Sequence, residues 1–531
     1  MPVSTPTSEK TATIPVEKVG ATPLYLAYLQ HAPAVREWYP HAPLRGKLPE
    51  RTDYPAERRE QVAAILEKQN RGWGAGEATL KNIERLRAGA AAIVTGQQVG
   101  LFGGPLYSVL KALTAIKLAE QHHAVPIFWL ATEDHDLAEV SFTNVLSPEY
   151  ELRKLSLHAK DEGLRVGDVK LPSSVTELTA ELKSFFGANE VTDLLARCYA
   201  PGTTFADAYA QLFAHLFREF GLILIDNRDS QLHKIAAPVF TKAAAHAVPL
   251  NQALQRRSQE LQAAGFHAQV HVENSSTLLF HHQNGRRIAV KIEGDSFHAG
   301  KSDWNATDLA KEVQKAPENF SANALLRPVI QDYLLPAIAY VGGAAEIAYF
   351  AQSEVLYREL LGRVTPVLPR GSTTLIEPGV ARLLDKYRLQ PLDAFVSAEQ
   401  LRIAIASRAL PKGVLHSFDE VREKVEAGLA KLEREVAQVD PTLLGAAENA
   451  GKKMRYQMRR LSERAARAHL RKQAEMDRQL RRISNSLYPH DNLQERELGS
   501  IYFLAKDGIG ILKTLYAALR TDTADHQLIW L

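Results

Sequence analysis

Four consecutive polar residues, Glu133, Asp134, His135 and Asp136, follow the apolar run VPIFWLAT. Carboxylates and an imidazole in that position could supply a general base, hold an ammonium group or bind a divalent metal ion. The alternative is a solvated loop in which Asp136 caps a helix. We expect His135, together with Glu133 or Asp136, to act as the catalytic base. We assign no metal ligands, because His-x-Asp alone does not define a metal site.

A glycine-rich loop precedes a helical run that begins near Leu106. A helix start offers unpaired N–H groups and the positive end of the helix dipole, and glycine lets an anion approach the backbone. The spacing matches neither the dinucleotide-binding GxGxxG pattern nor the phosphate-binding GxxxxGK[ST] loop. The sequence therefore predicts an anion-binding loop, unless the glycines only form a tight turn. Its candidate residues are Gln97, Gln98, Gly100, Gly103 and Gly104.

Two later segments could contact the anionic parts of a ligand. In the first, Arg327 could clamp a carboxylate or a phosphate through two parallel hydrogen bonds, unless it only forms a salt bridge with Asp332. The binding candidates of this segment are Arg327, Gln331, Asp332, Tyr340 and Glu346. The second segment, PRGSTT, supplies Arg370 and Ser372 as candidates for contacting a nucleotide, although a surface turn would have the same composition.

The elements that must position these residues are apolar runs around 90–97, 125–132 and 221–227, which alternate with helical segments. Continuous apolar strands separated by helices are typical of a parallel sheet with both faces covered. The pattern predicts an α/β fold with a doubly wound, Rossmann-like core. Such folds bind ligands beyond the carboxyl ends of their strands, and the polar candidates stand at those ends.

The remaining sequence divides by pattern into further segments. We predict a disordered leader over 1–20, the core over 21–379, a helical coiled-coil domain over 380–490 and a C-terminal segment, 491–531, that docks on the core. Two stretches near 145–200 and 265–320 break the α/β rhythm and are interpreted as insertions. The second alternates apolar and polar residues around Asn284-Gly285, which predicts antiparallel strands joined by a tight turn.

The coiled-coil domain shows helical apolar spacing. Apolar residues recur three or four positions apart over about 416–438, and after Asp440-Pro441 a helix of more than forty residues is expected to carry one apolar stripe, which Lys472 interrupts. The proline between the two helices predicts an antiparallel hairpin. Because the shorter helix would leave part of the stripe uncovered, we predict that residues 415–487 mediate a homodimer.

Charge and composition limit the partners. The net charge is only +3, so a local cluster would have to bind nucleic acid, and residues 452–482 hold twelve Lys and Arg against three acids. We expect the preceding acidic helix to balance this cluster, and we do not expect a nucleic-acid partner. A single cysteine, Cys198, excludes an internal disulfide, fits a reducing cytoplasm and is expected to be a packed thiol. No apolar stretch reaches the ~20 residues of a membrane span, so we expect a cytoplasmic protein without a membrane partner.

Several long motifs occur together in this chain: TGQQVGLFGGPLYSVLKALTAIKLA, PIFWLATEDHDLAEV, LLRPVIQDYLLPAIAYVGGAAEIAYFAQ and SLYPHDNLQERELGSIYFLAK. Their order and spacing resemble the BshC family of bacillithiol biosynthesis, over most of residues 20–531. The resemblance implies a Rossmann core with two insertions, similar to class I aminoacyl-tRNA synthetases, and a coiled-coil domain. One departure is Ala344, where the family pattern leads us to expect proline after Gly342-Gly343.

The resemblance also implies an activity, the last step of bacillithiol synthesis, in which a ligase joins L-cysteine to the amino group of glucosaminyl-malate. A carboxylate is a poor acyl donor, so we expect ATP, with Mg²⁺, to activate cysteine, and the amine must attack in its neutral form. Arg327 would hold a malate carboxylate or developing phosphate charge. Two alternatives stay open: a nucleotidyl-transfer or tRNA-related enzyme on the same core, and a non-enzymatic, dimeric scaffold that binds a metabolite.

Overall fold

The computed structural model describes residues 11–44, 46–160 and 163–531. The chain divides into two compact units. The first comprises Met1–Pro148, Arg153–Thr374 and Glu495–Ile529, and the second comprises Glu149–Leu152, Leu375–Gln494 and Trp530–Leu531. All of the candidate site residues predicted from the sequence belong to the first unit.

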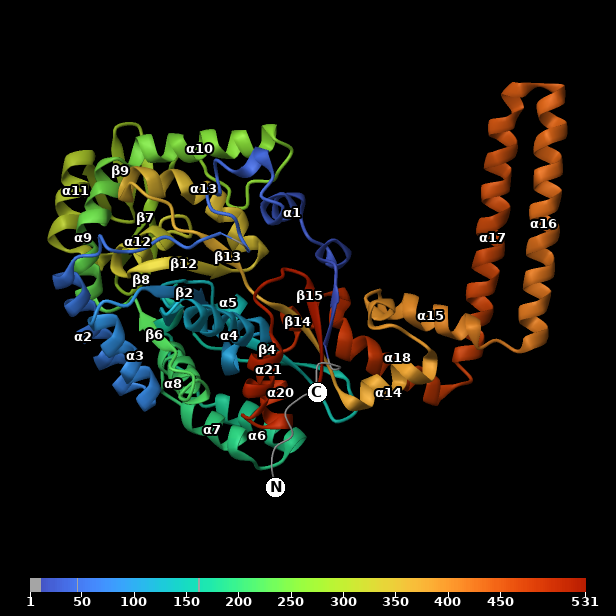
Figure 1. Cartoon of the computed structure of the whole chain (residues 1–531), viewed down its shortest axis with the longest axis horizontal. Helices are drawn as coiled ribbons and strands as arrows, with labels where there is room; N and C mark the ends of the chain where they lie inside the picture. The colour runs from blue at the N-terminus through green and yellow to red at the C-terminus, as the bar shows by residue number, and fades with distance from the viewer. Residues whose placement is uncertain (1–10, 45, 161–162) are drawn as a thin grey trace. The chain divides into compact units, whose positions relative to one another are not determined.

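A five-stranded parallel sheet forms the centre of the first unit (Figure 1). Its strands, in spatial order, are β13 (Val367–Pro369), β12 (Ala337–Gly342), β2 (Ala92–Gln97), β3 (Val125–Leu130) and β6 (Ile223–Asp226). The chain builds β2, β3 and β6 outwards in one direction and then returns to add β12 and β13 on the other side of β2. This is the Rossmann strand order, which confirms the predicted fold class, and its topological switch point lies between β2 and β12.

The two faces of this sheet are covered by different helices. On one face, Ile93 of β2 packs with α4 (Leu106–Gln121), the helix that connects β2 to β3. On the other face, Val94 belongs to a larger core that includes α2 (Ala56–Gly72) and α13 (Ala344–Leu361). Because successive side chains of a strand point to opposite faces, coverage on both sides requires the continuous apolar runs seen in the sequence.

Two long connections lie outside the parallel sheet. The first joins β3 to β6 through α5 (Leu137–Val140), β4 (Phe142–Leu146), β5 (Leu152–Ser156), α6 (Val175–Phe186), α7 (Glu190–Cys198) and α8 (Phe205–Leu216). The second joins β6 to β12 through α9 (Ser230–Ala245), α10 (Ala247–Ala263), β7 (Ser276–Gln283), β8 (Arg286–Glu293), β9 (Ser296–Ala299), β10 (Ser302–Asn305), α11 (Ala306–Lys315), β11 (Phe320–Ala322) and α12 (Arg327–Leu334). The β7–β8 hairpin turns at Asn284 and Gly285, whose φ angles are 52° and 79°. The predicted Asn-Gly turn is confirmed.

The segment predicted as a leader is partly folded. Strand β1 (Thr11–Ile14) pairs with β15 (His526–Trp530), which in turn pairs with β14 (Ser372–Ile376). A short 3₁₀ helix follows at Val16–Val19. The prediction of disorder is therefore wrong for residues 11–20, because alternating threonine suits an edge strand as well as a polar tail. Residues 1–10 lie outside the described residues.

The second unit is helical. It contains α14 (Pro378–Tyr387), α15 (Ala398–Arg408), α16 (Lys412–Val439), α17 (Leu444–Leu470) and α18 (Ala474–Leu487). Helices α16 and α17 lie side by side as the predicted antiparallel hairpin (Figure 1). The predicted helix of more than forty residues is wrong: α17 ends at Leu470, where Lys472 breaks the apolar stripe, and α18 packs on α14 and α15. Since α16 and α17 have 28 and 27 residues, the unequal length that suggested a homodimer is absent.

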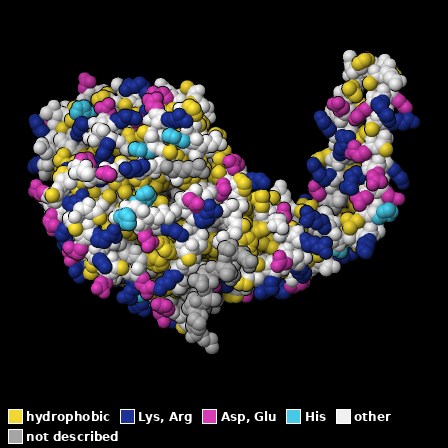
Figure 2. Space-filling view, in the orientation of Figure 1, with side chains coloured by type: hydrophobic (Ala, Val, Ile, Leu, Met, Phe, Trp, Pro, Cys, Tyr) yellow, Lys and Arg dark blue, Asp and Glu magenta, His cyan; other side chains and the backbone are white. Residues whose placement is uncertain are grey.

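The basic run of α17 and α18 is balanced by acids within the second unit. Arg455 pairs with Glu426 of α16 at 2.8 Å, and Arg467 pairs with Glu399 of α15 at 2.8 Å. Figure 2 shows basic and acidic side chains interspersed over the hairpin surface. The run is therefore a solvated helix face with mixed charge, which was the structural alternative to nucleic-acid binding.

Cys198, at the end of α7, is a buried free cysteine. Burial raises the pKa of its thiol to about 11, against the opposing effect of Arg197, so the thiol is protonated at neutral pH and is a poor nucleophile. This agrees with the predicted packed thiol. Of the helices in the described ranges, none combines the length and hydrophobicity needed to cross a membrane.

Candidate active site

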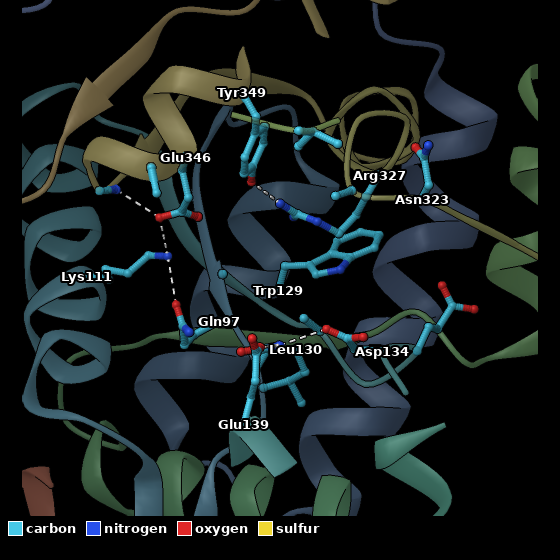
Figure 3. Close-up of a pocket in the computed structure, with 18 of the residues that line it drawn as sticks. Gln97, Lys111, Trp129, Leu130, Asp134, Glu139, Asn323, Arg327, Glu346 and Tyr349 are labelled. Carbon is cyan, nitrogen blue, oxygen red and sulfur yellow. Dashed lines mark hydrogen bonds and ion pairs between the residues drawn. The ribbon is translucent and has the colours of Figure 1, made fainter. Parts of the chain in front are cut away.

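A cavity of about 670 Å³ opens at the carboxyl ends of β2, β3 and β12, at the switch point of the sheet. Its volume is in the range of small-molecule sites. Gly96 and Gln97 end β2, Trp129 and Leu130 end β3, and Gly343 follows β12. In Figure 3, Arg327, Tyr349 and Glu346 lie across the pocket from Asp134 and Glu139. The pocket is therefore lined by both cationic and anionic groups.

A buried lysine joins two of the elements around the pocket. Lys111 lies in the second turn of α4, with only 1% of its side chain exposed, and its Nζ donates to Glu346 Oε2 at 2.7 Å and to Gln97 Oε1 at 3.2 Å (Figure 3). Glu346 also accepts from the Gly343 N–H at 2.8 Å and from the Tyr340 hydroxyl. Burial lowers the pKa of Lys111, and Glu346 opposes that effect. The predicted residue Tyr340 does not line the pocket and instead positions Glu346.

Arg327 is placed to bind an anion. It begins α12, lines the pocket and donates to the Tyr349 hydroxyl (Figure 3). Within the part of the chain that the structure describes, no carboxylate lies within 4.0 Å of its guanidinium. Burial opposes its charge, but Tyr349, Tyr340 and Glu346 raise its pKa, so the guanidinium stays charged. The predicted exposure of Arg327 to a ligand is thus supported by its position.

The other two candidates on α12 lie in the core. Gln331 and Asp332 are fully buried and do not line the pocket. Arg363 lies 3.5 Å from the Asp332 carboxylate and also donates to its backbone oxygen at 2.8 Å. The predicted binding role is not supported for either residue, because both are enclosed in the core beyond the cavity wall. The alternative Arg327–Asp332 salt bridge does not form, since Asp332 pairs with Arg363.

The four polar residues after β3 separate into two pairs. Glu133 and Asp134 line the pocket, whereas His135 and Asp136 do not. The Glu133 carboxylate lies 3.0 Å from Nε2 of buried His233 and accepts from Asn227 at 2.8 Å. Burial would raise its pKa, but His233 outweighs burial and lowers the pKa to about 2. Glu133 is therefore a structural ion-pair partner and a weak base, contrary to the predicted catalytic role.

His135 and Asp136 have other surroundings. The His135 side chain is 47% exposed, and its Nδ1 lies 3.2 Å from Arg287 Nη1. Asp136 accepts the Glu139 N–H at 3.3 Å and so caps α5, as the alternative interpretation proposed. The predicted base residues His135 and Asp136 therefore lie outside the pocket lining, because the chain turns after Asp134.

The glycine-rich loop is closed by the chain itself. The Leu106 N–H donates to the Leu498 oxygen at 2.9 Å, and the Gly103 N–H donates to the Tyr199 hydroxyl at 3.2 Å. Gly103 and Gly104 have φ of 90° and 68°, which favours glycine. Because these N–H groups already donate hydrogen bonds within the chain, they cannot bind an anion. The predicted anion-binding role is therefore wrong for Gly103 and Gly104, which form a packed turn. Of this loop, Gln97 and Gln98 line the main cavity.

The two candidate residues of the PRGSTT loop lie in different surroundings. Arg370 lines the pocket, and its Nη2 donates to Glu495 Oε1 at 2.6 Å. Ser372 lies outside the pocket lining, where its hydroxyl donates to the same carboxylate at 2.9 Å and lies 2.7 Å from His526 Nδ1. Ser372 belongs to a buried network of the β14–β15 sheet, so its predicted nucleotide contact is not supported.

Sequence reasoning missed several pocket residues. One of them, Lys111, could have been predicted, because a lysine at a core position of an apolar helix usually has a buried partner or a function. Among the others, Tyr107, Trp129, Glu139, Tyr349 and Arg496 stand in motifs already singled out, whereas Arg287 and Asn323 lie outside those motifs.

A second, smaller cavity of about 110 Å³ adjoins the first. Gly100, a predicted anion-binding residue, lines this cavity and not the larger one. Both cavities share the same five side chains: Gln97, Gln98, Tyr107, Glu139 and Arg496. No group of three or more His, Cys, Asp or Glu that could hold a metal ion occurs among the residues for which the structure gives positions.

Comparison with known families covers nearly the whole chain. Residues 10–371 match the N-terminal Rossmann-like domain of bacillithiol biosynthesis BshC, and residues 373–531 match its C-terminal coiled-coil domain. The chain belongs to the BshC family. Curated relatives named "Putative cysteine ligase BshC" include proteins of Koribacter versatilis, 42% identical over 97% of this chain and 99% of the relative, and Solibacter usitatus, 35% identical over 96% and 97%. The Salinibacter ruber protein of the same name is 33% identical over 99% of both chains.

The BshC domains and the structural units do not divide the chain identically. The coiled-coil match begins at residue 373 and runs to the end, yet Glu495–Ile529 belongs to the first unit. This returning segment brings Arg496 to the pocket. The departure from the expected BshC pattern, Ala344, is the first residue of α13, and Gly343 caps that helix with Glu346. Proline is tolerated at a first helical position but not required there.

Proposed function

We propose that this BshC protein is a cytoplasmic ligase that joins L-cysteine to the amino group of glucosaminyl-malate, the last step of bacillithiol biosynthesis. The observation that carries the proposal is the cavity at the Rossmann switch point, which is lined by the cations Arg327 and Lys111 and by the carboxylates Asp134 and Glu139. Both substrates carry carboxylate and ammonium groups at neutral pH, so a site for them needs both signs of charge. The name of the relatives supports the same activity.

The charged residues suit different parts of the amino sugar. Arg327 can pair with a malate carboxylate, since its guanidinium donates to the Tyr349 hydroxyl and no carboxylate of the described residues lies within 4.0 Å of it. Asp134 accepts from Gln98 at 2.7 Å and from the His135 N–H at 2.7 Å. Burial would raise its pKa, but these hydrogen bonds and Arg287 lower it. Asp134 is therefore better suited to hold the sugar ammonium group than to remove its proton.

We also propose ATP, with Mg²⁺, as the source of activation. When bound, ATP would transfer an adenylyl or phosphoryl group to the cysteine carboxylate and so make it a competent acyl donor. The glycine loop is not the phosphate site, because its N–H groups are occupied. Lys111 and Arg370 would instead contribute positive charge next to the phosphates. Their carboxylate partners, Glu346 and Glu495, keep them fixed in position.

The test is product analysis with cysteine, glucosaminyl-malate, ATP and Mg²⁺, with and without tRNA. We expect the cysteinyl product by mass spectrometry, independent of tRNA, together with stoichiometric AMP or ADP. Arg327→Gln should lower kcat/KM about 10²–10³-fold with an unchanged melting curve, and Arg327→Lys should recover only part of the loss. Product that appears only with tRNA would favour the nucleotidyl-transfer or tRNA-related alternative. Metabolite binding without turnover would favour the scaffold.

We propose, finally, that the α16–α17 hairpin pairs with a second copy. Val421, Leu432, Met454 and Leu461 are between 43% and 56% exposed on its two helices. Such apolar positions surrounded by charges of both signs suit a self-complementary, two-fold interface. Light scattering should give twice the chain mass of 58.8 kDa, and Leu461→Glu should reduce it to one chain. A wild-type mass of one chain at micromolar concentration would rule out the dimer.

A further inference from the structure

The smaller cavity has its own chemistry. Pro105, Val140 and Phe142 line this cavity alone, whereas Glu139 and Arg496 line both cavities. A third charged residue, Glu497, also lines the cavity. A site that combines apolar side chains with carboxylates and a guanidinium is complementary to a small amino-acid zwitterion. The volume of about 110 Å³ is far below that of a typical drug-sized ligand site, so it suits a compact side chain.

We propose that this cavity is the amino-acid subsite, with the cysteine thiol inside, the α-ammonium group on Glu139 and the carboxylate on Arg496. The assignment rests on the proposed ligase function and specifies where one substrate binds. It places the reacting carboxylate beside a residue that lines both cavities, where the amino sugar can reach it from the larger one.

Both charged residues are available for these contacts. Glu139 Oε2 accepts one hydrogen bond, from Gln98 at 2.8 Å, and neither carboxylate oxygen has a cationic partner within 4.0 Å among the described residues. Arg496 is exposed, and in the ranges that the structure covers no carboxylate lies within 4.0 Å of its guanidinium. Lys111 and Arg370, in contrast, already hold Glu346 and Glu495. Arg496 is therefore free to bind a carboxylate of a ligand.

The apolar side chains of the lining explain a preference for a thiol. Cysteine behaves as a small apolar side chain with a weak donor, so Val140 and Phe142 can cover it without leaving a strong polar group unsatisfied. Thr143 also lines this cavity, is 3% exposed, and its hydroxyl oxygen has no hydrogen-bond partner among the described residues. Gly499 lines the cavity beside it, and a Cβ there would lie 2.1 Å from the Thr143 hydroxyl. Any larger residue at position 499 would therefore displace the Thr143 side chain and change the shape of the cavity.

The first experiment measures steady-state kinetics of the full-length protein. Arg496→Gln and Glu139→Gln should each raise KM for cysteine about 10–100-fold while KM for glucosaminyl-malate changes less than about twofold. Arg520→Gln, a surface arginine of the same returning segment that pairs with Asp522, is the matched control and should change neither. If the two variants raise KM for the amino sugar and not for cysteine, the subsite is assigned to the wrong substrate and the proposal is overturned.

The second experiment needs no turnover, so it separates this proposal from the proposed ligase activity. Calorimetry would measure binding of cysteine, of 3-mercaptopropionate, which lacks the amine, and of cysteamine, which lacks the carboxylate. Arg496→Gln should weaken cysteine and 3-mercaptopropionate but not cysteamine, and Glu139→Gln should weaken cysteine and cysteamine but not 3-mercaptopropionate. This crossed pattern in a protein without ligase activity would support the subsite and refute the proposed function. Equal weakening of all three ligands, or L-leucine binding as tightly as L-cysteine, would overturn the subsite.

Discussion

Two turns of the parallel sheet have similar sequences and different roles. Each follows a strand, contains a glycine pair and precedes a helix, and residues in or next to both turns were predicted to contact a ligand. At the first, before α4, the Leu106 and Gly103 N–H groups donate to Leu498 and Tyr199. The returning C-terminal segment therefore closes this turn, and its glycines serve packing.

The second turn, before α13, opens into the cavity. Gly343 lines the pocket and donates its N–H to Glu346, which in turn holds the Lys111 ammonium group. The helix start is thus occupied by a carboxylate of its own first turn, and that carboxylate fixes a cation at the cavity wall. The comparison shows that a glycine-rich turn indicates a binding site only when the partners of its N–H groups are known, because backbone donors are rarely left unpaired.

The largest expected effect is at the open turn. Lys111→Met removes the cation from a buried pair and leaves Glu346 uncompensated, which should lower the free energy of unfolding by about 3–5 kcal/mol and abolish ligation. Urea denaturation and product analysis measure the two effects. The double variant Lys111→Met/Glu346→Gln should regain stability but not activity, because the uncompensated carboxylate is removed while the pocket cation stays absent. A stable but inactive single variant would show that the pair does not hold the two helices together.

A second effect concerns the loop after β3. Glu133, with its pKa lowered from 4.5 to about 2, stabilises the fold above about pH 4.5, and this contribution is lost as the pH falls toward 2. The pKa of His233 is raised, because Glu133 outweighs burial, so its contribution is present below 6.5 and is lost as the pH rises through the raised value.

The stability difference between wild type and Glu133→Gln should therefore be largest between about pH 4.5 and 6.5, at about 2–3 kcal/mol. Denaturant titrations at a series of pH values would measure it. A difference that does not vary with pH would mean that the two side chains are not an ion pair in solution.

The strands and the switch point could be predicted from sequence because continuous apolar runs report burial on both faces of a sheet. The position of Glu133 and Asp134 at the end of β3 follows from the same pattern. Which side chain then faces the cavity could not be predicted, since the direction of His135 depends on how the chain turns after the strand. Arg496 could not be predicted as a pocket residue either, because its place depends on a segment that returns from the helical unit.

A smaller effect is expected at the closed turn. Gly103 has a φ of 90°, and a Cβ there would lie 3.0 Å from the Ser500 hydroxyl and 3.3 Å from Leu212. Gly103→Ala should cost about 1–2 kcal/mol of stability from the backbone alone, with both KM values unchanged in the folded protein. Calorimetric melting and steady-state kinetics would show this separation. If Gly103→Ala instead raised KM for a substrate without lowering stability, the turn would have to be part of the binding site.

The smallest expected effect is that of His135→Ala, and it tests the predicted base directly. The side chain is 47% exposed, lies outside the pocket lining and contacts Arg287 through Nδ1. Removing an exposed side chain of this kind typically changes stability by no more than about 0.5 kcal/mol, and turnover should fall only a few-fold, through a less restrained Arg287. A general base would instead cost about 10²–10⁴ in rate. Kinetics across pH 6–9 distinguish the two, because loss of a base removes the acidic limb of the kcat profile, whereas loss of a positioning contact lowers the profile uniformly. A large fall with a missing limb would mean that the loop after β3 turns inward when substrate binds.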